Sequence, residues 1–285
     1  MNTDAHRSFV GAALFALLYL LLQLLSIAAM QQLVVSPEMR LEELILASVA
    51  GRFLAVVAST GLLLALWDRR PFSSVGLSLK RGWATEFAFG TALGLGMMGV
   101  LTAMLVGADQ ARITADPAFS PLHWAYLGVL LFVAAAAEEL LFRGYGFQRV
   151  LDAVGPAGSI AILSLLFGWV HRGNPNAGPL GLANAVLVGI LLALFYLRTR
   201  RLWLLIGMHW AWNFSQVSLG FPVSGIKIDQ MPLAALPLGP PALSGGSYGP
   251  EASWLCTVVI AAGFAGLLWR PKPATEGGSE DGYAP

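Results

Sequence analysis

The chain has 285 residues, of which 56% are hydrophobic and only 12% are charged, and its formal net charge is +1. Because soluble domains usually carry about 25% charged residues, this composition excludes an ordinary soluble protein and indicates an integral membrane protein. The net charge says nothing about nucleic acid, and no basic block suggests it either, so no nucleic-acid partner is expected. The single cysteine, Cys256, excludes an intramolecular disulfide and a thiolate metal cluster. No phosphate-binding glycine loop is present, which argues against ATP-driven transport by this chain alone.

Eight apolar runs follow one another along the chain. Each is a candidate membrane helix, because a spanning chain must satisfy its backbone hydrogen bonds internally. The runs cover about residues 9–30, 44–67, 87–106, 122–149, 158–171, 180–197, 202–219 and 252–269. The first is longer than the roughly 7–15 apolar residues of a cleavable signal peptide, so we interpret it as a retained helix. The Pro- and Gly-rich segment 220–250 is expected to be an outer loop without regular structure.

Basic residues gather after the second, sixth and eighth runs. They are Arg69, Arg70, Lys80 and Arg81, then Arg198, Arg200 and Arg201, and finally Arg270 and Lys272. The positive-inside rule places these segments in the cytoplasm, and with them both termini. The sequence therefore predicts an all-α polytopic bundle of about eight spans, built as one integral-membrane domain over residues 1–274. The small, acidic segment 275–285 is predicted to be a disordered tail.

Two features of the early runs indicate packing between helices. Arg52 lies inside the second run, and its simplest interpretation is an ion pair with a carboxylate on another helix, with a direct catalytic role as the alternative. In the third run, Gly90 and Gly94 are four residues apart. Glycines at this spacing let one face of a helix approach another helix closely, so we expect them to serve packing.

The fourth run carries three charges in the sequence Glu138-Glu139-x-x-x-Arg143. Charged side chains within a membrane helix are costly and are normally retained only where they pair or take part in function. Helical spacing places Arg143 one turn after Glu139 on the same face, whereas Glu138 lies about 100° around the helix from Glu139. We therefore predict that Arg143 neutralises Glu139 and that Glu138 faces a cavity.

Two more polar pairs lie in apolar runs. Phe167-x-x-x-His171 ends the fifth run, and His209-x-x-x-Asn213 lies in the seventh. Taken singly, each histidine is as easily explained as a core residue, and a Glu-Glu pair near an arginine occurs in many surface helices. Their combination in three apolar helices favours a functional site. The heights of Glu138, His171 and His209 along their helices overlap, so the three can meet inside the membrane.

This set of side chains suits the hydrolysis of a carbonyl compound, with a peptide bond as the first candidate. A carboxylate such as Glu138 can act as a general base on water. Two imidazoles can position that water or hold a metal that acidifies it, and an amide such as Asn213 can donate to a developing oxyanion. No cysteine is positioned with a histidine, so a cysteine nucleophile is not indicated, and the His-Glu-x-x-His zinc motif is absent.

In this order on separate membrane helices, the three motifs resemble the signatures of the CPBP intramembrane proteases. That family includes the type II CAAX prenyl endopeptidases and the bacteriocin-immunity (Abi) proteins of bacteria. The resemblance covers roughly Trp124–Gln216, about a third of the chain, within an expected catalytic core at about 122–217. It implies an intramembrane endopeptidase that acts on a membrane-associated peptide, such as a lipidated or CAAX-like one.

The resemblance also implies roles for single residues. The water-activating residues would be Glu138, His171 and His209. The oxyanion would be stabilised by Asn213, and the site would be supported by Glu139, Arg143 and Phe167. The family has been described both as metal-dependent and as glutamate-type. A bound zinc ion would have Glu138, His171 and His209 as ligands; we favour the version that requires no cofactor.

Two other functions use the same residues. In a proton-coupled transporter the glutamate and histidines would relay protons, but the fourth run is not split by Gly or Pro near its carboxylates and no inverted repeat is evident. In a non-catalytic immunity or scaffold protein the fold would serve binding alone, and the intact motifs argue against this. The expected partners are membrane lipid and a membrane-associated peptide, and the expected location is the inner (plasma) membrane.

Overall fold

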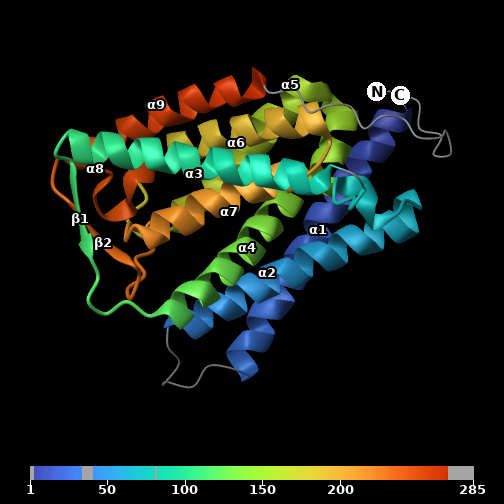
Figure 1. Ribbon diagram of the computed structural model, residues 1–285. Coiled ribbons are helices and arrows are strands. Elements are labelled where there is room, and N and C mark those ends of the chain that lie inside the picture. Colours follow the sequence, from blue (N-terminus) through green and yellow to red (C-terminus); the bar gives the residue numbers. More distant parts are fainter. Residues whose placement is uncertain (1–2, 34–40, 81, 269–285) are drawn as a thin grey trace.

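The structure is a computed structural model that describes residues 3–33, 41–80 and 82–268 (Figure 1). Its helices are α1 (Thr3–Leu33), α2 (Leu41–Leu63), α3 (Trp83–Gly107), α4 (Pro121–Arg143), α5 (Tyr145–Val170), α6 (Pro179–Thr199), α7 (Trp203–Ser218), α8 (Pro241–Ser244) and α9 (Trp254–Gly263). Its strands are β1 (Ala111–Ala115) and β2 (Leu233–Pro237). The predicted tail 275–285 and three of the basic residues, Arg81, Arg270 and Lys272, lie outside the described residues.

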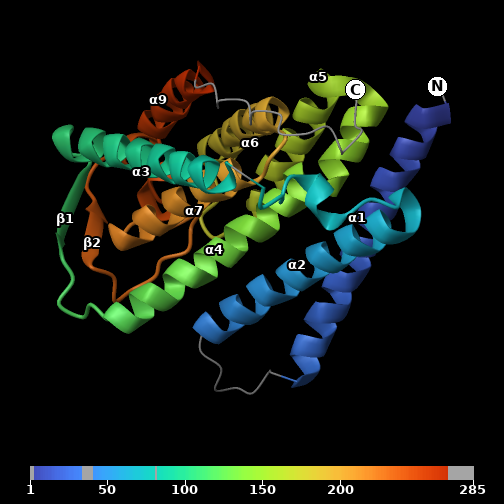
Figure 2. The ribbon, with the colours of Figure 1, turned by 45° about the vertical axis from the view of Figure 1, so that its right-hand side comes forward.

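Helix α4 stands between two groups of helices (Figure 2). On one side α2 packs against α4, and α1 packs against α2 and α5. On the other side α7 packs against α4 and carries α3 on its far face, while α6 lies between α5 and α9. The fourth and seventh apolar runs, which carry the Glu-Glu and His-Asn motifs, are therefore direct neighbours.

Five segments of the described chain are long and apolar enough to cross a membrane. They are Thr3–Gln31, Leu44–Asp68, Trp83–Gly107, Pro121–Gly173 and Pro179–Thr199. The predicted number of eight is not confirmed. The fourth and fifth runs fall in one segment, and α7 has only 16 residues, about 24 Å of helix against a hydrocarbon core of about 30 Å. The last run forms a short apolar helix, Trp254–Leu267.

The fourth and fifth runs meet at two local breaks. Helix α4 ends at Arg143, and α5 begins at Tyr145 after Gly144. Within α5, Gly155 has φ 76° and ψ 178°, and Pro156 follows it. Glycine tolerates positive φ without a steric penalty, and proline lacks the N–H that would continue the hydrogen-bond ladder. The second break therefore divides α5 close to the predicted boundary between the two runs.

The fold is mainly helical, as predicted, but the expectation that residues 220–250 form a loop without regular structure is wrong. Strand β1 pairs antiparallel with β2, with Ala111 opposite Pro237 and Ala115 opposite Leu233. The segment after β2 also contains α8 and short 3-10 turns. The strand partners are far apart in sequence, so no local pattern of turn residues could predict their pairing. The protein is mainly helical, with a small sheet at the end of the bundle opposite the start of α1 (Figure 1).

Side chains of the 220–250 region and its flanks hold that region in place. The carboxylate of Glu251 accepts hydrogen bonds from the indole of Trp212 (3.2 Å) and from the backbone N–H (2.6 Å) and hydroxyl (3.0 Å) of Ser224. Burial, with the nearby charge of Glu251, raises the pKa of Tyr248 to about 12. The phenol of Tyr248 therefore stays protonated at neutral pH.

The two basic loops of the described residues lie together. The backbone N–H of Leu202, just after Arg201, donates to the carbonyl of Gly76 at 2.9 Å. The indole of Trp203 donates to the carbonyl of Ser78 at 3.0 Å. The loop after the second run and the loop after the sixth run thus share one end of the bundle, which the predicted topology requires. That this end faces the cytoplasm stays a prediction.

Gly90 and Gly94 lie where α3 meets the backbone of α7, as their spacing predicts. A Cβ at Gly90 would overlap the carbonyl oxygen of Leu204, and one at Gly94 would overlap that of Met208. At Gly99 an added Cβ would meet nothing within 4 Å. Helix α7 is therefore held against α3 by backbone contact just before His209.

We expect Gly90→Ala to lower the free energy of unfolding by about 1–3 kcal/mol, because overpacking a close contact forces the two helices apart. The matched control is Gly99→Ala, which should be neutral or stabilising by up to about 1 kcal/mol, since alanine has the higher helix propensity. Denaturant titration of the two purified variants in detergent micelles measures both values. Equal stability of the two variants would contradict the backbone contact.

Candidate active site

Helix α4 begins with a cap that sets its register. The Ser120 hydroxyl accepts a hydrogen bond from the His123 backbone N–H at 3.3 Å, and Pro121 occupies the first turn, where proline is favoured. The helical period then turns Glu139 and Arg143 into the protein core, where their side chains are 0% and 2% exposed. Glu138 lies on a different face, and its side chain remains 26% exposed.

The predicted ion pair between Glu139 and Arg143 is present. Nη1 of Arg143 donates to both carboxylate oxygens of Glu139 at 3.2 Å, and Nη2 donates to the Gly189 carbonyl on α6 at 3.2 Å. The guanidinium also lies over the ring of Phe167 on α5, 4.6 Å from its centroid. A buried charge is tolerated when it is paired and its donors are used. This pair therefore joins α4 to α5 and α6.

His209 connects the two carboxylates. Its Nδ1 lies 2.8 Å from Oε1 of Glu139, and its Nε2 lies 3.8 Å from Oε2 of Glu138. An ionised carboxylate only accepts hydrogen bonds, so Nδ1 carries the proton in this contact. In the neutral ring Nε2 then presents its lone pair toward Glu138. The separation of 3.8 Å is longer than a hydrogen bond, which leaves room for a reacting atom beside both groups.

Phe167 links His171 to the group formed by Glu138, Glu139 and His209. Nδ1 of His171 lies 2.7 Å from the Phe167 carbonyl one turn earlier, and the two rings are 4.8 Å apart. The Phe167 ring also meets the ring of His209 in a T-shaped arrangement, with their centroids 6.4 Å apart. Within the described part of the chain, His171 makes no hydrogen bond or ion pair with Glu138. The structure thus places His171 beside the site through Phe167 and leaves its Nε2 available.

Asn213 lies one turn after His209 on α7 and is half-buried. In the residues that the structure describes, its side chain forms no hydrogen bond. Glu138, Glu139 and His209 are therefore brought together directly, while Asn213 is placed next to them without a contact that fixes it. Its role in binding an oxyanion stays a prediction.

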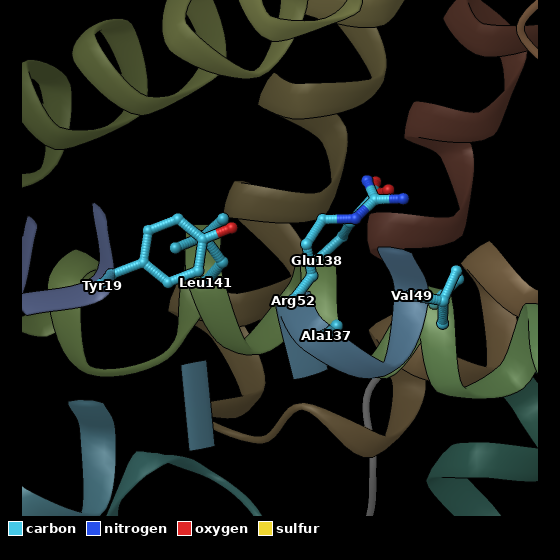
Figure 3. A pocket seen from close by; sticks show the side chains of 7 residues that line it. Tyr19, Val49, Arg52, Ala137, Glu138 and Leu141 are labelled. Atoms are coloured by element: carbon cyan, nitrogen blue, oxygen red, sulfur yellow. The ribbon is translucent and has the colours of Figure 1, made fainter. Parts of the chain in front are cut away.

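Glu138 faces a small cavity, as predicted (Figure 3). The other lining residues come from α1, α2 and α4, and they are Tyr19, Val49, Arg52, Ala134, Ala137 and Leu141. The cavity volume is about 10 Å³, close to what a single water molecule needs. Tyr19 was not predicted as a site residue, because its only signal is a lone tyrosine in a Leu-rich run. The cavity joins the Glu-Glu motif on α4 to the two N-terminal helices.

The expected ion pair of Arg52 is not found. No carboxylate of the described residues lies within 4 Å of its guanidinium, and its Nε donates to the Ser48 carbonyl at 3.4 Å in its own helix. Arg52 instead projects into the cavity that Glu138 lines (Figure 3).

The three proposed zinc ligands are not gathered as a metal site in the structure. Among the described residues, no group of three or more His, Cys, Asp or Glu side chains is arranged to hold a metal ion, whereas structural and catalytic zinc sites need at least three protein ligands around the ion. The Nδ1 atoms of His209 and His171 contact Glu139 and the Phe167 carbonyl, which leaves their Nε2 atoms as the possible ligand atoms. The version of the reaction that requires no cofactor stays a prediction.

The comparison with protein families agrees with the motifs. Residues 120–215 match the family model described as "Type II CAAX prenyl endopeptidase Rce1-like". No curated protein and no solved structure matches the chain. The matched region is about a third of the chain and contains the three motifs on α4, α5 and α7. Residues 120–215 of this multi-pass membrane protein are therefore similar to the Rce1-like family of type II CAAX prenyl endopeptidases, as the motif resemblance predicts.

Proposed function

We propose that the protein is an intramembrane endopeptidase that hydrolyses a peptide bond of a membrane-associated substrate. The observation that carries the proposal is the chain of contacts from Arg143 through Glu139 and His209 to Glu138, buried within apolar helices. The family match supports it, since this chain of contacts lies within the matched residues. CAAX-like and lipidated peptides are the substrate classes to test first, and the inner (plasma) membrane is the proposed location.

In the proposed mechanism Glu138 is the general base. It takes a proton from a water molecule as the water oxygen bonds to the scissile carbonyl carbon, and an oxyanion forms. The proton then passes to the leaving nitrogen, the C–N bond breaks, and the products are an acid and an amine. His209 orients the water through Nε2, because Glu139 fixes the proton on Nδ1. Arg143 keeps Glu139 ionised for that purpose.

His171 and Asn213 complete the proposed site. The Nε2 atom of His171 is the nitrogen not used by the Phe167 carbonyl, and we assign it to the water or the leaving group. The Asn213 amide lies one turn from His209 and would donate to the oxyanion, a role for which side-chain amides are suited. Phe167 holds the two histidine rings and the Arg143 guanidinium in fixed relation.

Glu138→Gln tests the proposal, and we expect cleavage to fall by about 10²–10⁴-fold, because an amide cannot take the proton from water. The measurement is cleavage of a quenched fluorescent peptide, with and without a prenyl group, by the purified protein in lipid nanodiscs. The matched control is Asp229→Asn, which neutralises an exposed loop carboxylate and should cleave at the wild-type rate. Both variants should keep the wild-type thermal unfolding temperature.

Activity of Glu138→Gln within threefold of wild type would overturn the assignment of the base. The same assay after thorough dialysis against a chelator tests the metal-free mechanism. We expect wild-type cleavage to persist, and its loss with recovery on adding zinc would overturn that part of the mechanism.

A further inference from the structure

We propose that Arg52 of α2 is an anion-stabilising residue of the active site, which binds the oxyanion that develops on the scissile carbonyl. The inference rests on the proposed function and adds a residue from outside the matched region, since α2 ends well before residue 120. It makes the N-terminal helices part of the catalytic machinery and not only a support for it.

Arg52 is a cation inside an apolar helix, and no carboxylate of the described residues is paired with it. Arg52 lies near the middle of α2, in a segment apolar enough to span, and is half-buried. An arginine carries five N–H donors, and the structure shows one hydrogen bond, from Nε to Ser48 at 3.4 Å. An intramembrane charge is costly and is retained where it has a partner or a function. Since none of the described carboxylates pairs with Arg52, the remaining donors indicate a ligand.

The donors of Arg52 point into the cavity that Glu138 also lines, and the two residues come from different helices (Figure 3). The phenol of Tyr19 lines the same space. The remaining lining residues are Val49, Ala134, Ala137 and Leu141, which offer no polar side-chain group. Any negative oxygen formed beside Glu138 would therefore meet Arg52 in apolar surroundings, where a charge interaction is stronger than in water.

Arg143, the other arginine near Glu138, differs from Arg52 because it is paired with a carboxylate. Arg143 is bound to Glu139 by two contacts of 3.2 Å and to the Gly189 carbonyl, so its charge is already matched. The charge of Arg52 is not matched by a carboxylate of the described residues. Once Glu138 has taken the proton from water it is neutral, and the charge of Arg52 then faces the oxyanion without a competing carboxylate in the cavity.

The anion at Arg52 has two candidate sources. A volume of about 10 Å³ holds about one oxygen atom, and an oxyanion presents one charged oxygen whereas a terminal carboxylate presents two. The oxyanion at the scissile bond is therefore the occupant that we propose. A peptide C-terminus that reaches Arg52 is the other source of the same chemistry, and the experiment separates the two.

The test compares Arg52→Gln and Arg52→Lys with wild type on two peptides that differ only in ending with a free carboxylate or an amide. Arg52→Gln should lower kcat by about 100-fold on both peptides, the size of effect seen when one oxyanion donor is lost. KM should stay within threefold, because the interaction forms in the transition state. Arg52→Lys keeps the charge and should have an intermediate kcat. Arg112→Gln, which removes an exposed arginine of β1, is the matched control with wild-type kcat.

Two results would overturn the inference: kcat of Arg52→Gln within threefold of wild type, or a rise in KM confined to the free-carboxylate peptide. The second result would assign Arg52 to the substrate C-terminus. If Arg52→Gln does not fold, Arg52→Lys decides, and a kcat of Arg52→Lys equal to wild type overturns the inference.

Glu138→Gln is measured in parallel. If Glu138→Gln also cleaves at the wild-type rate, the proposed function fails. If Glu138→Gln is inactive while the Arg52 variants are fully active, only the role of Arg52 fails.

Discussion

Replacing His209 by asparagine should lower kcat by about 10²–10⁴-fold while the protein keeps its wild-type unfolding temperature. The asparagine amide can still donate to Oε1 of Glu139, which the imidazole Nδ1 contacts at 2.8 Å, so the buried carboxylate stays satisfied. What disappears is the second ring nitrogen, which lies 3.8 Å from Glu138. Peptide cleavage in nanodiscs and thermal unfolding measure the two effects separately.

The control for this experiment is His123→Asn. His123 stacks on Tyr126 near the start of α4, outside the group around Glu138, and the variant should cleave at the wild-type rate. Loss of stability in His209→Asn comparable to its loss of activity would show that His209 is mainly a packing residue. Full activity of His209→Asn would remove it from the mechanism.

The second large effect concerns the buried ion pair. Arg143→Met should lower the free energy of unfolding by about 3–5 kcal/mol, because it leaves the fully buried carboxylate of Glu139 without its cation. The double variant Glu139→Met with Arg143→Met should recover part of that loss, since replacing both members by apolar residues of similar size is tolerated. It should nevertheless be inactive, because Nδ1 of His209 loses its acceptor. Denaturant titration and peptide cleavage measure the two properties.

A loss below about 1 kcal/mol in Arg143→Met would contradict the structural role of the pair. Equal instability of Glu138→Gln and Arg143→Met would undercut the division between a supporting pair and a reacting carboxylate. That division rests on burial, with Glu139 at 0% and Glu138 at 26% side-chain exposure.

The features that sequence could predict depend on local helical spacing. The four-residue separation of Glu139 and Arg143 fixes their pairing on any helix, and the structure shows the pair. The spacing of Gly90 and Gly94 likewise predicts the close approach of α3 to another helix, which is α7. These predictions need no knowledge of how the helices are arranged.

The features that sequence could not predict depend on which segments meet. A local pattern does not show that Tyr19 and Arg52 line the cavity of Glu138, because they come from helices more than 80 residues earlier in the chain. The number of spans also depends on three-dimensional context. Hydrophobicity alone does not separate α7, which packs between α3 and α4, from a helix that crosses the bilayer.

The pairing of β1 with β2 has a consequence for how the protein reaches its native state. The two strands bracket residues 116–232, so their hydrogen bonds close one large loop that contains α4, α5, α6 and α7. Closing a loop of this length costs conformational entropy that two five-residue strands repay poorly by themselves. The sheet therefore becomes stable only after the intervening helices have inserted and packed. We therefore expect the sheet to form when the helices that carry the candidate site are already in place.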